Sequence, residues 1–172
     1  MAEYPLHLAR RRMLADGRTV TIRPIRAEDE ALERAFLDRL SPESRRLRFQ
    51  HLVATPPAEL VRFLTHVDYD RHMAFVCEAA DGSLVGNARY VVNADQRSCE
   101  FGVVVADDWH HAGIAQLLME ALFRAARACK LDTMEGLVLS ENRDMLDFAK
   151  LLGFELSTDP VKPALVRVVK KL

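Results

Sequence analysis

The sequence has few cysteines and little excess charge, and each shortage narrows the possible functions. Its 172 residues include three cysteines, one tryptophan, and seven each of glycine and proline. Three widely spaced cysteines fit neither a disulfide framework nor a set of zinc ligands. We therefore expect Cys77, Cys99 and Cys129 to be reduced thiols in the core, and nothing in their pattern favours a nucleophilic role.

The sequence also lacks the features that would attach it to nucleic acid or to a membrane. The 24 basic and 25 acidic residues leave a formal charge of -1, and the basic cluster at 10–12 is too short to bind a phosphate backbone. No apolar run approaches bilayer length, and the N-terminus lacks the order of regions found in a signal peptide. With 49% hydrophobic residues, we expect one cytoplasmic domain over residues 1–172 that binds neither nucleic acid nor membrane.

Local patterns in the N-terminal half predict a hairpin followed by helices. Asp16 and Gly17 separate two extended runs within residues 1–24, which indicates an antiparallel pair that forms part of the domain. A helical segment then runs to Leu40. Ser41 and Pro42 are typical of an N-cap and a first helical residue, and a third short helix is expected near Pro57.

The C-terminal half reads as strands alternating with two helices. Runs at 72–79, 83–93 and 98–106 predict a three-stranded meander, and apolar residues recur at helical spacing from Ile114 to about Lys130. A short strand at 134–139, a helix that Gly153 ends and two closing strands complete the pattern. This order predicts an α/β (α+β) domain with one mixed sheet.

The turn between the third strand of the meander and the following helix has the features of an anion site. In "DDWHHAGIAQLLM" the only glycine is Gly113, and the first helical turn, from Ile114 to Gln116, contains no carboxylate. Free N–H groups at a helix start bind phosphate. Taken alone, the turn is better explained as an ordinary strand-to-helix loop, because lone glycines before helices are common and neither a Walker loop nor a dinucleotide fingerprint is present.

The turn and five further motifs, which occur in order along the chain, resemble those of a known family. "HHAGIA" resembles the acetyl-CoA loop Arg/Gln-x-x-Gly-x-Gly/Ala of the GNAT superfamily of N-acetyltransferases. "VTIRPIRAEDE", "LSPESRRLRF", "VDYDRHMAFV", "EFGVVV" and "NRDMLDFAKLLGF" resemble the acyltransferase module of bacterial protein lysine acetyltransferases, over about residues 13 to 169. The resemblance implies a GNAT-type fold: a mixed, mostly antiparallel sheet flanked by helices.

The resemblance also implies where acetyl-CoA, the cosubstrate, binds. Asn142 would contact the pantetheine amides. Backbone of the preceding strand, at Val103, Val104 and Val105, would pair with the pantetheine arm and direct an N–H at the thioester oxygen. The pyrophosphate of coenzyme A would be held by the backbone N–H groups of the turn, which belong to His111, Ala112, Gly113, Ile114 and Ala115.

Glu100 is the residue to which the resemblance assigns catalysis. It would act as the general base that takes a proton from the acceptor ammonium, directly or through a water molecule. The alternative is a surface carboxylate on a half-exposed strand. Glu100 alternates with the apolar Cys99 and Phe101, so its side chain faces away from that row, and this favours the base.

Two positions depart from the superfamily pattern. His110 replaces the usual Arg or Gln of the loop and supplies a charge only when it is protonated. Ala149 occupies the position where many members have a tyrosine that protonates the leaving thiolate. A thiolate leaves tolerably without such an acid because the pKa of a thiol is near 8.5. The lysine acetyltransferase modules that this chain resembles also have a small residue there.

Two classes of function follow from the sequence. The first is acetyl transfer from acetyl-CoA to a primary amine, either a protein lysine or a small molecule. The second is a catalytically silent module that binds acyl-CoA and regulates a partner chain. No metal is expected, because the adjacent His110 and His111 point in different directions and lack a third ligand. A homodimer is left open.

Overall fold

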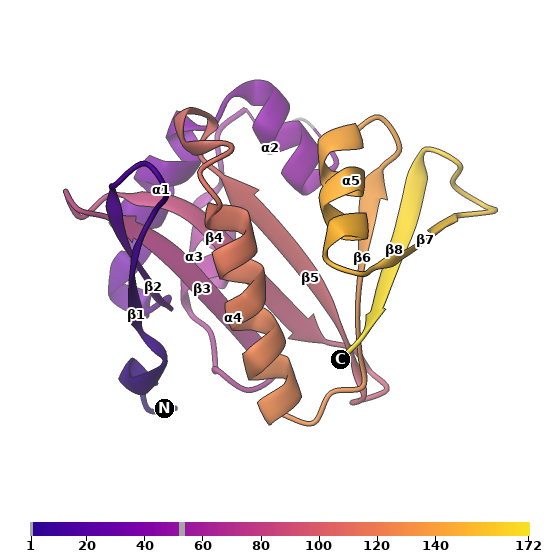
Figure 1. Cartoon of the computed structure of the whole chain (residues 1–172), viewed down its shortest axis with the longest axis horizontal. Coiled ribbons are helices and arrows are strands. Elements are labelled where there is room, and N and C mark those ends of the chain that lie inside the picture. Colours follow the sequence, from indigo (N-terminus) through magenta and orange to yellow (C-terminus); the bar gives the residue numbers. More distant parts are fainter. Residues whose placement is uncertain (1, 52–53) are drawn as a thin grey trace.

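One eight-stranded sheet with helices on both faces forms the framework of the molecule (Figure 1). The computed structural model describes residues 2–51 and 54–172, so Met1 of the predicted hairpin lies outside the described residues. The strands are β1 (Arg10–Met13), β2 (Thr19–Pro24), β3 (His72–Ala79), β4 (Leu84–Val92), β5 (Ser98–Val105), β6 (Thr133–Leu139), β7 (Glu155–Thr158) and β8 (Leu165–Lys171). The helices are α1 (Glu30–Arg39), α2 (Pro42–Phe49), α3 (Ala58–Thr65), α4 (Ile114–Ala128) and α5 (Arg143–Leu151), with short 3-10 turns at Leu6–Leu8, Ala27–Asp29 and Asp107–Trp109.

The strand order is β1-β2-β3-β4-β5-β6-β8-β7. Among the described strands, β5 and β6 pair in parallel and all other neighbours pair antiparallel. The sequence-based prediction of a mixed, mostly antiparallel sheet flanked by helices is therefore confirmed.

The hairpin and the helix start predicted for the N-terminal half are both present, but the hairpin connection differs in length from the prediction. The predicted hairpin forms, but its connection runs from Leu14 to Arg18, since the N–H of Leu14 donates to the carbonyl of Arg18 at 2.8 Å. The connection is therefore longer than the two-residue turn at Asp16 and Gly17 that the sequence indicated, and that length was wrong. As predicted, the hydroxyl of Ser41 caps α2 by accepting from the N–H of Ser44, and Pro42 is the first helical residue.

Successive residues of β4 face different helices. A Cβ atom on Gly86 would lie 3.1 Å from side-chain atoms of Ile114 and Leu118, so the glycine allows α4 to pack closely on this face. Asn87 and Arg89 point to the other face, where they hydrogen bond to Glu33 of α1 and to the carbonyl of Leu64 in α3. The sheet thus separates α4 from α1 and α3.

The strands β5 and β6 pair only at one end. The ladder joins Ser98, Cys99 and Glu100 to the start of β6, and beyond Glu100 the two strands diverge (Figure 1). β6 instead pairs with β8 from Thr133 to Leu139. The divergence leaves one edge of β5 without a strand partner, and the resulting gap opens toward α2, α4 and α5.

Two of the three cysteines are buried, as predicted, and the third is not. Cys77 and Cys99 lie in the sheet, where burial raises the pKa of both thiols to about 12. Cys129 is exposed, so the prediction of a core thiol there was wrong. Cys129 follows the last residue of α4, beyond the turns that cover the sheet.

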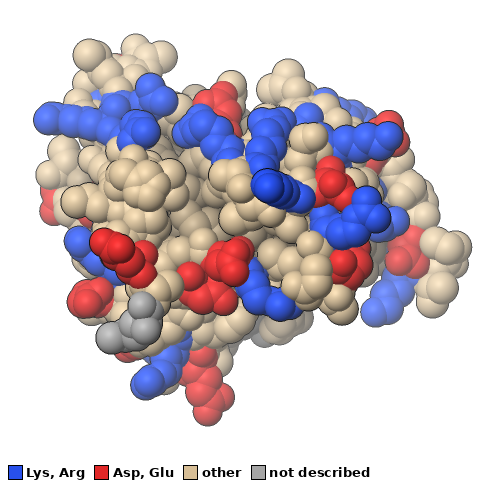
Figure 2. Space-filling model, turned by 90° about the horizontal axis from the view of Figure 1, so that it is seen from below, with Lys and Arg blue, Asp and Glu red and all other residues tan. Residues whose placement is uncertain are grey.

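The surface carries both signs of charge. On the face shown in Figure 2, acidic and basic side chains are interspersed among uncharged ones. Among the helices described, none is both long and apolar enough to span a membrane. The described part of the chain also contains no cluster of three or more His, Cys, Asp or Glu side chains placed to hold a metal ion.

Candidate active site

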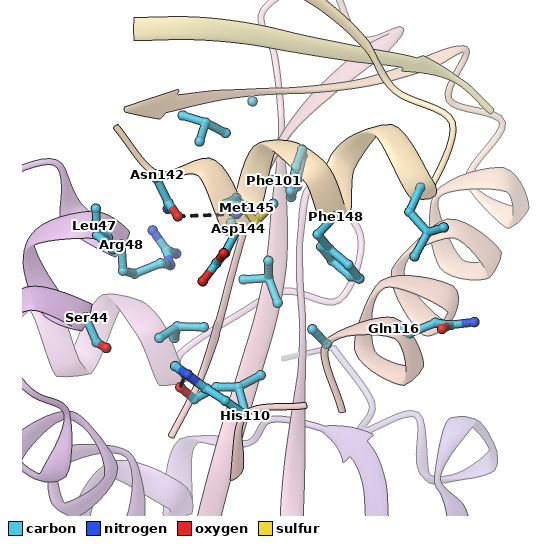
Figure 3. Close-up of a pocket in the computed structure, with 18 of the residues that line it drawn as sticks. Ser44, Leu47, Arg48, Phe101, His110, Gln116, Asn142, Asp144, Met145 and Phe148 are labelled. Carbon is cyan, nitrogen blue, oxygen red and sulfur yellow. Dashed lines mark hydrogen bonds between the residues drawn. The ribbon is translucent and has the colours of Figure 1, made fainter. Parts of the chain in front are cut away.

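A cavity of about 490 Å³ lies where β5 and β6 diverge (Figure 3). It is bounded by the second half of β5, the middle of β6, the turn before α4, the start of α5 and one face of α2. Most of the residues predicted to bind the cosubstrate line it, together with Glu100. These predicted residues are Glu100, Val103, Val104, Val105, His110, His111, Gly113, Ala115 and Asn142, whereas Ala112 and Ile114 do not line the cavity.

The turn before α4 has the geometry of an anion site. Gly113 has a φ of 84°, a left-handed conformation that glycine adopts without strain, and a Cβ atom built there would meet nothing within 4 Å. Among the residues that the structure describes, no side chain caps α4, and the first turn of the helix contains no acidic residue. The N–H groups at the helix start therefore face open space next to the cavity, where an anion fits.

His110 takes a role that the sequence did not indicate. Its Nε2 lies 3.0 Å from the carbonyl oxygen of Val105, so the ring links the turn to the end of β5. The neighbouring Trp109 is covered by the guanidinium of Arg18, 3.8 Å from the ring centroid, which fixes the turn to the N-terminal hairpin. One nitrogen of the His110 imidazole thus supports the turn, while the side chain also lines the cavity.

Glu100 is exposed and lines the cavity. Its neighbour Phe101 points to the opposite face, where the ring packs at 5.1 Å from Phe154. The predicted alternation is therefore present in the structure. Glu100 shares its face of β5 with Gly102 and Val104, the face that α2 covers, and its carboxylate is accessible to a molecule bound between the two strands.

The other predicted positions lie on α5. The Oδ1 atom of Asn142 caps α5 by accepting from the N–H of Met145 at 3.3 Å, and its Nδ2 has no hydrogen-bond partner among the described residues. Asn142 can therefore cap the helix and still donate into the cavity. Ala149 is fully buried and does not line the cavity. The position of the missing tyrosine thus faces the core in this chain.

The wall formed by α2 was not anticipated from the sequence, because a helix with three arginines reads as a solvated surface. Ser41 and Ser44 hydrogen bond to Asp107. Partial burial raises the pKa of the Asp107 carboxyl, but these hydrogen bonds lower it, and the net pKa lies below the ordinary value. On the other side, Nη1 of Arg46 lies 2.5 Å from Glu141. α2 is thus attached to both sides of the gap. The cavity residues that α2 and its end contribute are Ser44, Leu47, Arg48 and Gln50.

Comparison with known proteins identifies this arrangement. The model of the acetyltransferase (GNAT) family matches residues 30–154, a span that contains the diverging strands, the turn before α4 and the cavity. The chain belongs to the GNAT acetyltransferase family. It is accordingly an acyltransferase, and the resemblance seen in the sequence is confirmed at the level of the family.

Individual GNAT relatives support the assignment. Acetyltransferase PA5475 of Pseudomonas aeruginosa is 39% identical over 150 residues, which cover 86% of this chain and 81% of that protein. The GNAT domain of S. lividans PAT superposes with a TM-score of 0.92 at 25% identity, over 99% of this chain and 100% of the other. Spermidine N-acetyltransferase from Vibrio cholerae, solved with CoA and spermine, has the same fold, with a TM-score of 0.71 at 19% identity over 88% of this chain and 95% of that one.

Proposed function

We propose that this protein transfers the acetyl group of acetyl-CoA to a primary amine of a protein lysine, with Glu100 as the general base. One observation carries the proposal. An exposed carboxylate and a carboxylate-free helix start line the same cavity, between the free edge of β5 and the middle of β6. This combination suits a reaction that binds an anionic cosubstrate at one end and removes a proton at the other.

The residues present fit the parts of acetyl-CoA in turn. The backbone N–H groups from His111 to Ala115 would hold the pyrophosphate at the start of α4. The free edge of β5 at Val103, Val104 and Val105 would pair with the pantetheine amides, and Nδ2 of Asn142 would donate to one of their carbonyls. A backbone N–H of this edge would polarise the thioester carbonyl.

Transfer would follow a direct attack. Glu100 accepts a proton from the acceptor ammonium, which frees the nitrogen lone pair. The neutral amine attacks the thioester carbonyl carbon, a C–N bond forms, and the C–S bond then breaks with its electron pair on sulfur. The coenzyme A thiolate leaves without a tyrosine, since Ala149 stands at that position, and the proton that the attacking nitrogen loses as the amide forms passes through water to the sulfur.

A structural relative and the sequence motifs support the choice of acceptor. The S. lividans PAT domain covers this chain almost completely, and the sequence motifs resemble lysine acetyltransferase modules, which favours a protein lysine. The polyamine enzyme shares only the fold, so a small-molecule amine is the second candidate. The accessible carboxylate of Glu100 favours turnover over a silent acyl-CoA-binding module.

A thiol-release assay with acetyl-CoA tests the proposal. The acceptors should include proteins, lysine peptides, polyamines and amino acids, with mass spectrometry to locate the acetyl group. We expect acetylation of lysine side chains. Calorimetric binding of acetyl-CoA without turnover on any amine would instead identify a silent module, and release of thiol with polyamines alone would identify a small-molecule enzyme.

A further inference from the structure

Arg48 reaches from the last turn of α2 into the cavity (Figure 3), and its guanidinium lies against Gly102 of β5. A Cβ atom built on Gly102 would lie 2.6 Å from its Cζ and Nη2 atoms and 2.9 Å from Nη1. Real Cβ atoms do not approach so closely, so the glycine is what allows the guanidinium to rest on the strand. Arg48 therefore sits two residues along the strand from Glu100, on the same face.

This guanidinium has no anionic partner within the described residues. Of its neighbours on α2, Arg46 pairs with Glu43 and Glu141, and Arg45 has no anionic partner among the described residues either but donates a hydrogen bond to the carbonyl of Ala54. The Phe49 ring, 5.1 Å from Cζ of Arg48, offers no hydrogen-bond acceptor. Arg48 is half-buried, and its guanidinium has five N–H donors for which the described residues provide no hydrogen-bond acceptor. Arg48 thus presents unused donors to the cavity.

The charge of Arg48 persists in this position. Burial lowers the pKa of its guanidinium, whereas the charges of Glu33 and Glu100 act in the opposite direction. An arginine remains protonated at neutral pH even after a substantial shift. The acceptor end of the cavity therefore holds a fixed positive charge beside the carboxylate of Glu100, with Asp144 as a second acidic residue in the lining.

A fixed cation at this point discriminates among amines. Residues two apart on a strand are separated by roughly 6.5–7 Å, so a molecule with its nitrogen at Glu100 places atoms a few bonds away beside Arg48. A second ammonium there, as in a polyamine, is repelled. A carboxylate there accepts two parallel hydrogen bonds from the guanidinium, the geometry for which arginine is best suited.

We propose that Arg48 binds a carboxylate that the acceptor carries close to its reacting amine. The inference rests on the proposed amine acetylation and narrows its substrate class. For a protein lysine, the carboxylate belongs to an acidic residue that flanks it. For free lysine, it is the molecule's own α-carboxylate.

Paired acceptors that differ in one charge test the inference. Capped Glu-Lys and Gln-Lys dipeptides represent the flanking residue, and lysine and lysinamide represent the free amino acid. Each is assayed for kcat/KM with acetyl-CoA and is titrated calorimetrically into the protein loaded with CoA, which measures binding without turnover. We expect the carboxylate member of at least one pair to be favoured roughly ten-fold in both measurements, and the pair that responds identifies the source of the carboxylate.

Substitutions of single arginines attribute the preference to one side chain. Arg48→Met should bring the ratio within each pair to about one, and Arg48→Lys, which keeps the charge without the planar fork, should retain part of it. Arg124→Met removes the same charge from an exposed position of α4 outside the cavity and should leave the ratio unchanged. Circular dichroism checks folding, and if Arg48→Met does not fold, comparison of Arg48→Lys with Arg124→Met still tests the role of Arg48.

The outcomes separate this inference from the proposed function. Acetylation of amines with equal use of both members of each pair overturns the role of Arg48 and leaves amine acetylation standing. Preferential binding of the acidic member without any turnover supports the Arg48 site and overturns amine acetylation. Loss of the preference in Arg124→Met overturns the inference. It is also overturned if transfer from succinyl-CoA is faster than from acetyl-CoA and depends on Arg48, because Arg48 would then bind a carboxylate of the acyl group and not of the acceptor.

Discussion

The side-chain amide of Asn87 donates a hydrogen bond of 2.6 Å to Oε1 of Glu33 in the interior between α1 and the sheet. Neither residue is more than 2% exposed, and Oε2 of Glu33 has no hydrogen-bond partner in the described part of the chain. The nearest cation is Arg89, with Nη2 at 4.0 Å from Oε1. Burial raises the pKa of Glu33 to about 7, against the attraction of Arg89 and Arg48. This carboxyl therefore changes charge near neutral pH.

Glu33 should make stability depend on pH. Below pH 7 the folded protein holds its proton, while the unfolded chain releases it near the ordinary value of 4.5. The stabilisation is thus complete below pH 4.5 and is lost as pH rises through 7. Relative to Glu33→Gln, the wild-type free energy of unfolding should fall by up to about 3 kcal/mol between pH 4.5 and 8.

Urea denaturation of both proteins across this range measures the effect. His72, whose pKa burial lowers to about 4, gives a slope of opposite sign, but it is present in both proteins and its contribution cancels in the difference. A difference between the two proteins that stays constant from pH 4.5 to 8 contradicts the prediction.

Gly113→Ala should weaken acetyl-CoA binding while lowering the stability of the folded protein only slightly. A Cβ atom there enters open space at the helix start, so the folded protein bears only the strain of a positive φ, of order 1 kcal/mol. Gly82→Ala is the matched control, because Gly82 has a φ of 88° and equally open surroundings in the β3–β4 turn. Thermal denaturation should show similar losses for both variants, and calorimetry should show weaker acetyl-CoA binding only for Gly113→Ala. Equal affinities would remove the turn from the binding site.

Glu100→Gln should lower turnover by roughly 10²- to 10⁴-fold and leave acetyl-CoA affinity nearly unchanged, since it keeps size and loses basicity. The loss should shrink as pH rises, because more of the acceptor lysine, with a reference pKa near 10.4, is then already neutral. Initial rates from pH 7 to 9.5 with a saturating acceptor measure this. Full activity at pH 7 would make Glu100 an ordinary surface carboxylate and leave Asp144, the second acidic residue of the lining, or a water chain as the candidate base.

His110 should matter as a hydrogen-bond donor. His110→Leu removes the bond to the Val105 carbonyl and should reduce acetyl-CoA affinity by roughly five- to ten-fold, the equivalent of one hydrogen bond of about 1 kcal/mol. His110→Gln, which can still donate to that carbonyl, should bind nearly as the wild type does. If His110→Arg binds more tightly than both wild type and Gln above pH 7, charge on the phosphates dominates and the supporting role is wrong.

Gly102→Ala should displace Arg48 without unfolding the protein. The atoms that the new Cβ would meet are at the far end of a flexible side chain, so the guanidinium can move and stability should change by less than about 1 kcal/mol. The preference for acceptors with a carboxylate should fall as it does in Arg48→Met. Retention of the full preference would show that Arg48 reaches the acceptor from another position.

The sequence by itself determined the features that depend on neighbouring residues. Ser41 and Pro42 begin α2 because a side-chain oxygen and a fixed φ suit a helix start wherever it lies. Gly113 and the first turn of α4, which lacks acidic residues, could be predicted because they too depend only on neighbouring residues. The side of β5 on which Glu100 lies follows from the period of two in any strand.

Tertiary structure decided what depends on distant pairing. In the sheet, β8 lies between β6 and β7. Because β6 pairs with β8 along its whole length, it diverges from β5, and no local sequence pattern encodes this strand order. The packing of the elements also buries Ala149 in the core and places His110 within hydrogen-bond distance of Val105. Cys129 is exposed because it follows the last residue of its helix. Arg48 lies against Gly102 because α2 crosses the gap, where it contacts Asp107 and Glu141. Periodicity fixes which face of an element a side chain occupies, whereas its partner across the gap depends on how separate elements pack, and that is set by the whole core at once.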